Sequence, residues 1–203
     1  ASGGGGKKGG LRGGKGGVWE GGIRVPLIIR GPGIKPNSFC HSRVVGYDFF
    51  PTFCELAGVK QALPEGIEGG SILPLLATGK GEVKRPRQEL VFHFPHYQGD
   101  TPHSAIFLGN LKMMKFYETG KLSLFDLSKD LFERNDLSAS MPEETIRLHN
   151  RLNLYLDLVG AELPKANPKY DPANPPEMSK GKGKKGDKGG GKKGGKGERE
   201  KAK

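Results

Sequence analysis

Glycine and lysine crowd both ends of this chain of 203 residues and confine a folded core to the residues between them. Residues 1–17 hold ten Gly, three Lys and one Arg, without an acid. Residues 179–203 hold nine Gly, ten Lys and one Arg against three acids. Because glycine loses much backbone entropy on ordering, such segments do not fold unaided. We expect a flexible loop at the start, one folded region, and a disordered tail.

Charge is distributed as unevenly as glycine. The net charge is +11, of which the two ends carry +4 and +8, so residues 18–178 carry −1. This excludes a uniformly basic nucleic-acid-binding domain. The tail, residues 179–203, can attract any polyanion through charge alone. It has no aromatic side chain on which bases could stack, so we expect non-specific polyanion contact and no specific nucleic-acid binding.

Other classes of protein are excluded by single features. No apolar run approaches the ~18 residues of a transmembrane helix. Two cysteines, Cys40 and Cys54, are too few for a disulfide scaffold or a zinc finger. They could form one bridge or remain free thiols. The chain starts at Ala1 without Met and reads as a cut end, so the lack of a visible signal peptide says nothing about the compartment.

The first half of the folded region predicts a strand followed by a helix. Residues 25–29 form a short apolar run typical of a buried strand. Asp48 can cap a helix over residues 49–56, which Gly58 ends. Its expected buried stripe comprises Phe49, Phe50, Phe53, Leu56 and Ala57. Residues 71–76 suit a short helical turn. Because this unit is too small to bury its own strand, it resembles the last piece of a larger α/β sheet.

The second half predicts a small antiparallel meander closed by a helix. The strand candidates are residues 90–94, 105–108, 111–117 and 122–127. A helix opens at Pro142 after a Ser140 cap and stops at Gly160. Its expected apolar face is Ile146, Leu148, Leu152, Leu156 and Val159. The expected core of the meander is Phe92, Phe94, Phe107, Phe116, Phe125 and Phe132.

The most informative segment is residues 11–26, where a lysine stands on a glycine-rich loop. Glycines let backbone N–H groups approach an anion closely, and Lys15 adds a compact positive charge. Glu20 and Arg24 could pair and brace the loop. Trp19 could anchor the loop by packing or stack on a sugar. The segment is not a P-loop, because Gly16 follows Lys15, and a flexible linker with an incidental lysine remains an alternative.

The string G-K-G-x-x-x-E-G-G-x-R-x-P in this segment resembles a signature of type I sulfatases, which belong to the alkaline-phosphatase superfamily. Further motifs in the same order strengthen the resemblance, and Phe92–Tyr97 is similar to a segment of bacterial members. The other motifs are Asp48–Thr52 with Glu55–Gly58, Gly69–Leu76, Leu111–Lys112 and Leu124–Leu127. The resemblance covers roughly residues 11–160 and implies the C-terminal portion of a sulfatase.

The fold that the resemblance implies is α/β. Residues 1–88 would be the C-terminal end of an alkaline-phosphatase-like α/β/α sheet domain, with the glycine-rich site loop at residues 1–22. Residues 89–163 would be a small antiparallel-sheet subdomain packed by a C-terminal helix. Residues 164–203 would be a disordered linker and a basic low-complexity tail.

The activity that the resemblance implies is hydrolysis of sulfate monoesters, of a sulfated small molecule or polysaccharide. The family uses Ca²⁺ and a formylglycine made within C/S-x-P/A-x-R, and the strings at Cys40 and Cys54 do not fit that motif. We therefore expect both cofactors upstream, no metal ligand in this chain, and an inactive fragment when it is alone. Lys15 lies where the family places a lysine that contacts the sulfate.

Several functional alternatives remain open. His93 and His96 could bind substrate outside the sulfate, with His103 joining them, or they could serve structural hydrogen bonds. The chain could instead be a catalytically inactive polyanion-binding remnant, or part of a phosphate or phosphonate ester hydrolase of the same superfamily. The resemblance implies a periplasmic or secreted location.

Overall fold

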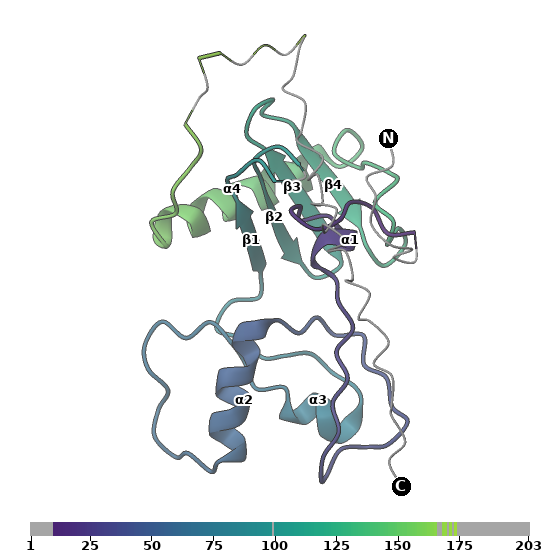
Figure 1. The fold of residues 1–203 in the computed structure, drawn as a ribbon, viewed down its shortest axis with the longest axis vertical. Coiled ribbons are helices and arrows are strands. Elements are labelled where there is room, and N and C mark those ends of the chain that lie inside the picture. Colours follow the sequence, from purple (N-terminus) through teal and green to yellow (C-terminus); the bar gives the residue numbers. More distant parts are fainter. Residues whose placement is uncertain (1–9, 99, 166–167, 170, 172, 174–203) are drawn as a thin grey trace, which may run out of the picture.

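A computed structural model describes residues 10–98, 100–165, 168–169, 171 and 173 (Figure 1). The predicted disordered tail lies outside the described residues. The helices are α1 (Glu20–Ile23), a 3₁₀ turn η1 (Gly46–Asp48), α2 (Phe49–Leu56), α3 (Leu73–Thr78) and α4 (Pro142–Leu158). The strands are β1 (Leu90–Phe94), β2 (His103–Leu108), β3 (Leu111–Phe116) and β4 (Leu122–Asp126).

The four strands form one antiparallel sheet in the order β1-β2-β3-β4, which confirms the predicted meander. Short turns connect β2 to β3 and β3 to β4, as expected when each strand pairs with its neighbour in sequence. In the register of β3, Lys112 lies opposite Phe107 on one side and Phe125 on the other.

Alternate residues of the strands face two different partners, because side chains of a strand alternate between the faces of a sheet. One face packs against α4, which crosses it in Figure 1. This contact consists of Ile106, Met113 and Leu124 from the sheet and Leu148, Leu152 and Leu156 from α4. Burial of six large apolar side chains gives the helix and the sheet a shared core.

The opposite face of the sheet packs against the glycine-rich segment near the start of the chain. Val18 and Trp19 are buried there with Ala105, Phe107, Met114 and Phe125. In Figure 1, α1 accordingly lies on the side of the sheet away from α4. The predicted site loop is therefore attached to the antiparallel sheet, although about 70 residues of other structure separate the two along the chain.

The ends of α4 agree with the prediction, but its N-terminal contacts do not. The residue before the helix is Met141, and no side chain caps its first turn. The predicted Ser140 cap is wrong, because its hydroxyl donates to the carbonyl oxygen of Leu137 (3.1 Å). Ile146 and Val159, predicted for the apolar face, are 57% and 49% exposed and do not belong to the cluster that α4 buries against the sheet.

The predicted buried strand at residues 25–29 is wrong for the described part of the chain. This segment is extended but has no strand partner there. Val25 is 76% exposed and Ile28 is 91% exposed. A strand is stabilised by backbone hydrogen bonds to a neighbour, and the four described strands pair only with one another.

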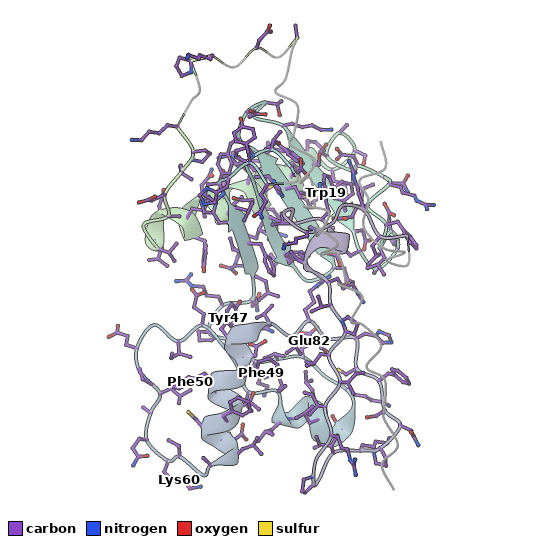
Figure 2. The ribbon with its side chains drawn as sticks, in the orientation of Figure 1. Trp19, Tyr47, Phe49, Phe50, Lys60 and Glu82 are labelled. Atoms are coloured by element: carbon purple, nitrogen blue, oxygen red, sulfur yellow. The ribbon has the colours of Figure 1, made fainter. Side chains whose placement is uncertain are left out.

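The buried stripe predicted for α2 is also wrong. Phe50, labelled on α2 in Figure 2, is exposed, and so are Phe53 and Leu56. The side chains buried on this helix are Pro51 and Thr52. Thr52 faces inward because its hydroxyl donates to the carbonyl oxygen of Asp48 and accepts from the backbone N–H of Ile72. The two hydrogen bonds of Thr52 thus decide which face of α2 is buried.

Asp48 joins η1 and α2 to the chain near Gly70 and Arg85 instead of capping the helix as predicted. Its carboxylate accepts hydrogen bonds from the backbone N–H of Val45 (2.8 Å) and of Gly70 (3.1 Å). The guanidinium of Arg85 donates to both carboxylate oxygens, at 2.8 and 2.6 Å. Asp48 is fully buried.

Both cysteines, Cys40 and Cys54, are free thiols.

Candidate functional site: the lysine loop

Lys15 lies in a tight turn that glycine makes possible. The backbone N–H of Gly17 donates to the carbonyl oxygen of Gly14 (3.2 Å), so Lys15 and Gly16 are the two central residues of the turn. Gly16 has φ +89°. A turn with positive φ at its second central position favours glycine, because other residues clash there. This geometry explains the order Gly-Lys-Gly.

Close backbone approach constrains the same loop a second time. A Cβ atom on Gly16 would lie 1.9 Å from the carbonyl oxygen of Gln98. A Cβ on Gly22 would lie 2.0 Å from the carbonyl oxygen of Gly17. The lysine loop, defined here as residues 12–20, therefore contacts both α1 and the segment that follows β1.

Of the two glycines that flank Lys15, only Gly16 should be sensitive to replacement by alanine. We expect Gly16→Ala to displace the loop and lower the thermal midpoint of unfolding, because it adds a clash and a strained φ. Gly14→Ala is the matched control, since a Cβ there meets nothing within 4 Å. Calorimetry of both variants measures the effect, and equal midpoints would contradict the tight-packing argument.

Trp19 anchors the loop to the sheet. Its ring is 7% exposed and packs 5.8 Å from the rings of both Phe116 and Phe125. The guanidinium of Arg12 lies 3.6 Å above the ring, and the indole N–H donates to the carboxylate of Asp100 (2.6 Å). The ring and the polar edge of the side chain are thus engaged within the protein, as expected of a packing anchor.

The predicted pair of Glu20 and Arg24 is present, at 3.4 Å between a carboxylate oxygen and a guanidinium nitrogen. Glu20 is 4% exposed, and its other carboxylate oxygen lies 3.2 Å from the ammonium of Lys112. The proposed bracing of the loop by Glu20 stays a prediction, but the structure adds a second cation to it.

Lys112 and Glu133 are site residues that sequence reasoning missed. Both are fully buried, and the ammonium of Lys112 lies 2.6 Å from the carboxylate of Glu133. Burial raises the pKa of the Glu133 carboxyl, and the charge of Lys112 acts against that shift. A lysine next to the apolar pair Met113 and Met114 of β3 was a signal for Lys112. The sequence has no such signal for Glu133, whose φ is positive (55°).

His103 also holds the loop. It is fully buried at the start of β2, and its Nε2 accepts a hydrogen bond from the backbone N–H of Val18 (2.9 Å). Its Nδ1 donates to the carbonyl oxygen of Thr101, which assigns a neutral imidazole with the proton on Nδ1. His103 therefore contacts the backbone of the loop and has no ring nitrogen left for a substrate.

His93 and His96 have different surroundings in the structure. His93 Nδ1 lies 2.7 Å from the hydroxyl of Ser104, and Nε2 lies 2.9 Å from the carbonyl oxygen of Glu162. These bonds tie the sheet to the segment after α4, so the geometry gives His93 a bridging role. His96 is exposed in the segment after β1, two residues before Gln98. Contact of either histidine with substrate stays a prediction.

Lys15 itself is exposed to solvent on the lysine loop. Among the described residues, none forms a hydrogen bond or ion pair with its ammonium. The nearby carboxylates are already engaged: Glu20 and Glu133 by Lys112, and Asp100 by Trp19. Lys15 thus presents a positive charge that no carboxylate of the described residues pairs with, which suits an anion.

Residues 14–157 match a family model described as N-sulphoglucosamine sulphohydrolase, C-terminal. The chain belongs to this family. The matched region begins at Gly14, immediately before Lys15, and ends within α4, so it contains most of the lysine loop, the whole sheet and nearly all of α4. The predicted sulfatase resemblance is confirmed, including its restriction to the C-terminal portion.

Curated relatives agree with the family. A protein named sulfatase from Formosa agariphila is 35% identical over 158 residues, covering 70% of this chain and 28% of the relative. Arylsulfatase K of Mus musculus is 30% identical over 145 residues, covering 66% and 25%. The chain therefore spans about a quarter of the length of these relatives.

A solved structure supports the fold. It concerns the metabolism of multiple glycosaminoglycans by Bacteroides thetaiotaomicron and aligns with a TM-score of 0.57 and 27% identity. The alignment covers 72% of this chain and 32% of that protein. The α/β class predicted from the sequence is thus confirmed for a C-terminal sulfatase region. None of the helices in the described part of the chain has the length and apolar character of a membrane span.

Proposed function

We propose that this chain is the C-terminal part of a sulfatase that hydrolyses sulfate monoesters, and that Lys15 contacts the sulfate. The observation that carries the proposal is the exposed ammonium of Lys15, without a partner among the described residues, on a loop whose backbone is fixed by buried contacts. Membership of the sulfatase family supplies the reaction.

The chemistry suits a fixed cation. During sulfate-ester cleavage, negative charge develops on oxygens of the transferring group and of the leaving group. A preorganised positive charge stabilises that state without having to reorganise at the moment of reaction. Lys15 would bind a sulfate oxygen, and the turn formed by residues 14–17 would fix the direction from which its side chain approaches.

The calcium ion and formylglycine that the family resemblance implies do not fit the residues of this chain. No group of three or more His, Cys, Asp or Glu side chains suited to a metal occurs in the part of the chain that the structure describes. The carboxylates around the lysine loop bind Lys112 and Trp19 instead. We propose that both cofactors belong to a part of the protein outside this chain, and we assign them no step here.

The exposed apolar side chains favour a part of a larger enzyme over an independent remnant. Val25, Ile28 and Phe39 are 76%, 91% and 87% exposed, and the outer face of α2 adds Phe53 at 62%. Large exposed apolar surfaces on soluble proteins are usually covered by a partner. We propose that the remainder of a sulfatase polypeptide covers them, which would give residues 25–29 the strand partner they lack here.

We propose a sulfated carbohydrate as the substrate class. The matching family is described by an N-sulphoglucosamine substrate, and the structural neighbour concerns glycosaminoglycans. His96 is the candidate for contact with the sugar, because its segment packs against Gly16 through Gln98. The charged tail could hold the same polyanionic substrate.

The direct test is hydrolysis by the full-length protein that contains this chain. We expect release of sulfate from sulfated glucosamine units, with slower release of phosphate or phosphonate from matched esters. Faster cleavage of the phosphate or phosphonate ester would replace the sulfatase proposal with another activity of the superfamily. A native product that begins near Ala1 and cleaves no ester would support the inactive remnant.

The tail can be tested by chromatography on immobilised heparin. We expect the protein with residues 179–203 to elute at higher salt than a variant in which a neutral Gly/Ser segment of equal length replaces them, because each neutralised anion releases counterions. Equal elution of the two proteins would end the polyanion proposal.

A periplasmic or secreted location is likewise proposed from the family, and cell fractionation of the native host tests it.

A further inference from the structure

We propose that Lys112 is a positioning residue, which fixes the backbone that carries Lys15 and does not itself meet the substrate. This inference deepens the proposed function and rests on it for the role of Lys15. It is carried by the contacts that Lys112 makes at the base of the lysine loop.

The ammonium of Lys112 is fully engaged. It donates to the carbonyl oxygen of Val18 (2.7 Å), to a carboxylate oxygen of Glu133 (2.6 Å) and to a carboxylate oxygen of Glu20 (3.2 Å). An ammonium has three donors, so these three acceptors use all of them. Because the side chain is fully buried and all its hydrogens are committed, Lys112 has no donor left for a hydrogen bond to an anion.

The contacts of Lys112 and Glu133 enclose Lys15 along the chain. Before Lys15, the guanidinium of Arg12 donates to the carbonyl oxygen of Glu133 (2.8 Å). After Lys15, Lys112 binds the carbonyl oxygen of Val18, and the other carboxylate oxygen of Glu133 accepts the backbone N–H of Glu20 (2.9 Å). The loop is therefore held before its exposed lysine by the backbone of Glu133, and after it by the buried charges of Lys112 and Glu133.

Stability alone does not explain this group of charges. Burying ions carries a desolvation penalty, and well-packed apolar residues at such sites are often as stabilising or more so. The neighbours of Lys112 across the sheet are Phe107 and Phe125, which would suit an apolar side chain. An apolar residue could not donate hydrogen bonds to the carbonyl oxygen of Val18 and to two carboxylates. These hydrogen bonds specify one conformation of the loop.

A double-mutant cycle distinguishes positioning from general stability. Lys112→Met alone would leave two carboxylates in contact, so we combine it with Glu133→Gln in the full-length protein. If Lys112 acts by positioning Lys15, the two substitutions together should lower kcat/KM for a sulfate ester about tenfold or more when Lys15 is present. In a Lys15→Ala background they should lower it less than about twofold. An equal loss in both backgrounds would overturn the proposal.

The matched control is Lys115→Met. Lys115 is on the same strand, but its ammonium binds Asn153 of α4 at 3.0 Å, on the other face of the sheet. It should leave kcat/KM unchanged. A loss equal to that of the Lys112 variant would show that any lysine of β3 has this effect, and would also overturn the proposal.

Amide hydrogen exchange gives a readout that needs no activity. In the Lys112→Met/Glu133→Gln variant, the amides of Val18 and Glu20 should exchange at least about tenfold faster, while those of α4 keep their protection. Equal acceleration in α4 would mean global destabilisation and contradict the inference. If the parent protein cleaves no sulfate ester but the exchange result holds, the proposed function fails while the loop-fixing role of Lys112 stands.

Discussion

Lys15→Ala in the full-length protein should lower kcat for sulfate-ester hydrolysis by about 10²–10³-fold, the range for removing one preorganised group that stabilises developing charge. The reason is geometric as well as electrostatic. The turn at residues 14–17 and the anchors at Val18 and Trp19 fix the loop, so neighbouring cations cannot easily replace the lost ammonium. Steady-state kinetics on a sulfated monosaccharide measures the loss.

The control for this prediction is Lys60→Ala, another exposed lysine, which lies just beyond α2 (Figure 2). It should leave turnover unchanged. Both variants should keep the urea midpoint of the parent, because neither side chain is buried. Turnover of Lys15→Ala within twofold of the parent would remove Lys15 from the site.

Asp48→Ala should give the largest loss of stability, about 3–5 kcal/mol, as expected when one partner of a buried ion pair is removed. It would leave the guanidinium of Arg85, only 9% exposed, without its carboxylate. It would also leave the backbone N–H groups of Val45 and Gly70 without an acceptor. Two of these donors, Gly70 and Arg85, connect η1 to segments more than 20 residues away.

Urea unfolding followed by circular dichroism measures this loss. Glu55→Ala on the exposed side of α2 is the matched control and should change the free energy of unfolding by less than about 0.5 kcal/mol. A cost for Asp48→Ala no larger than that of the control would mean that the network at Asp48 contributes specificity without stability.

The antiparallel half of the fold was predictable because its stabilising contacts are local. Each strand pairs with the next one in sequence, so periodicity and turn residues near residues 109 and 120 were sufficient. The helix α4 was found from the spacing of Leu148, Leu152 and Leu156, which are the side chains it buries.

The first half could not be predicted in the same way. Residues 25–29 have the composition of a buried strand, but composition does not provide the neighbouring strand that would cover them. On α2 the apolar residues outnumber the polar ones, yet the bonds of Thr52 decide which face is turned inward. In both places the structure depends on a partner that periodicity cannot identify.

In the candidate site too, the residues within one short motif were predictable and the distant ones were not. Lys15, Glu20 and Arg24 share one short motif, and its glycine spacing drew attention to them. Lys112 and Glu133 act on that motif from 92 and 113 residues away from Glu20. A single sequence contains no signal for such pairing, so a buried lysine in β3 could be noticed but not assigned a partner.

These long separations also order the events of folding. Lys112 meets Val18 across 94 residues, and Arg12 meets Glu133 across 121. Closing such long loops is entropically slow, so contacts within the meander should form earlier. During synthesis, the lysine loop emerges from the ribosome before the sheet, yet it cannot reach its final conformation until Glu133 has followed it. The segment that carries Lys15 is thus translated well before the residues that complete its fold.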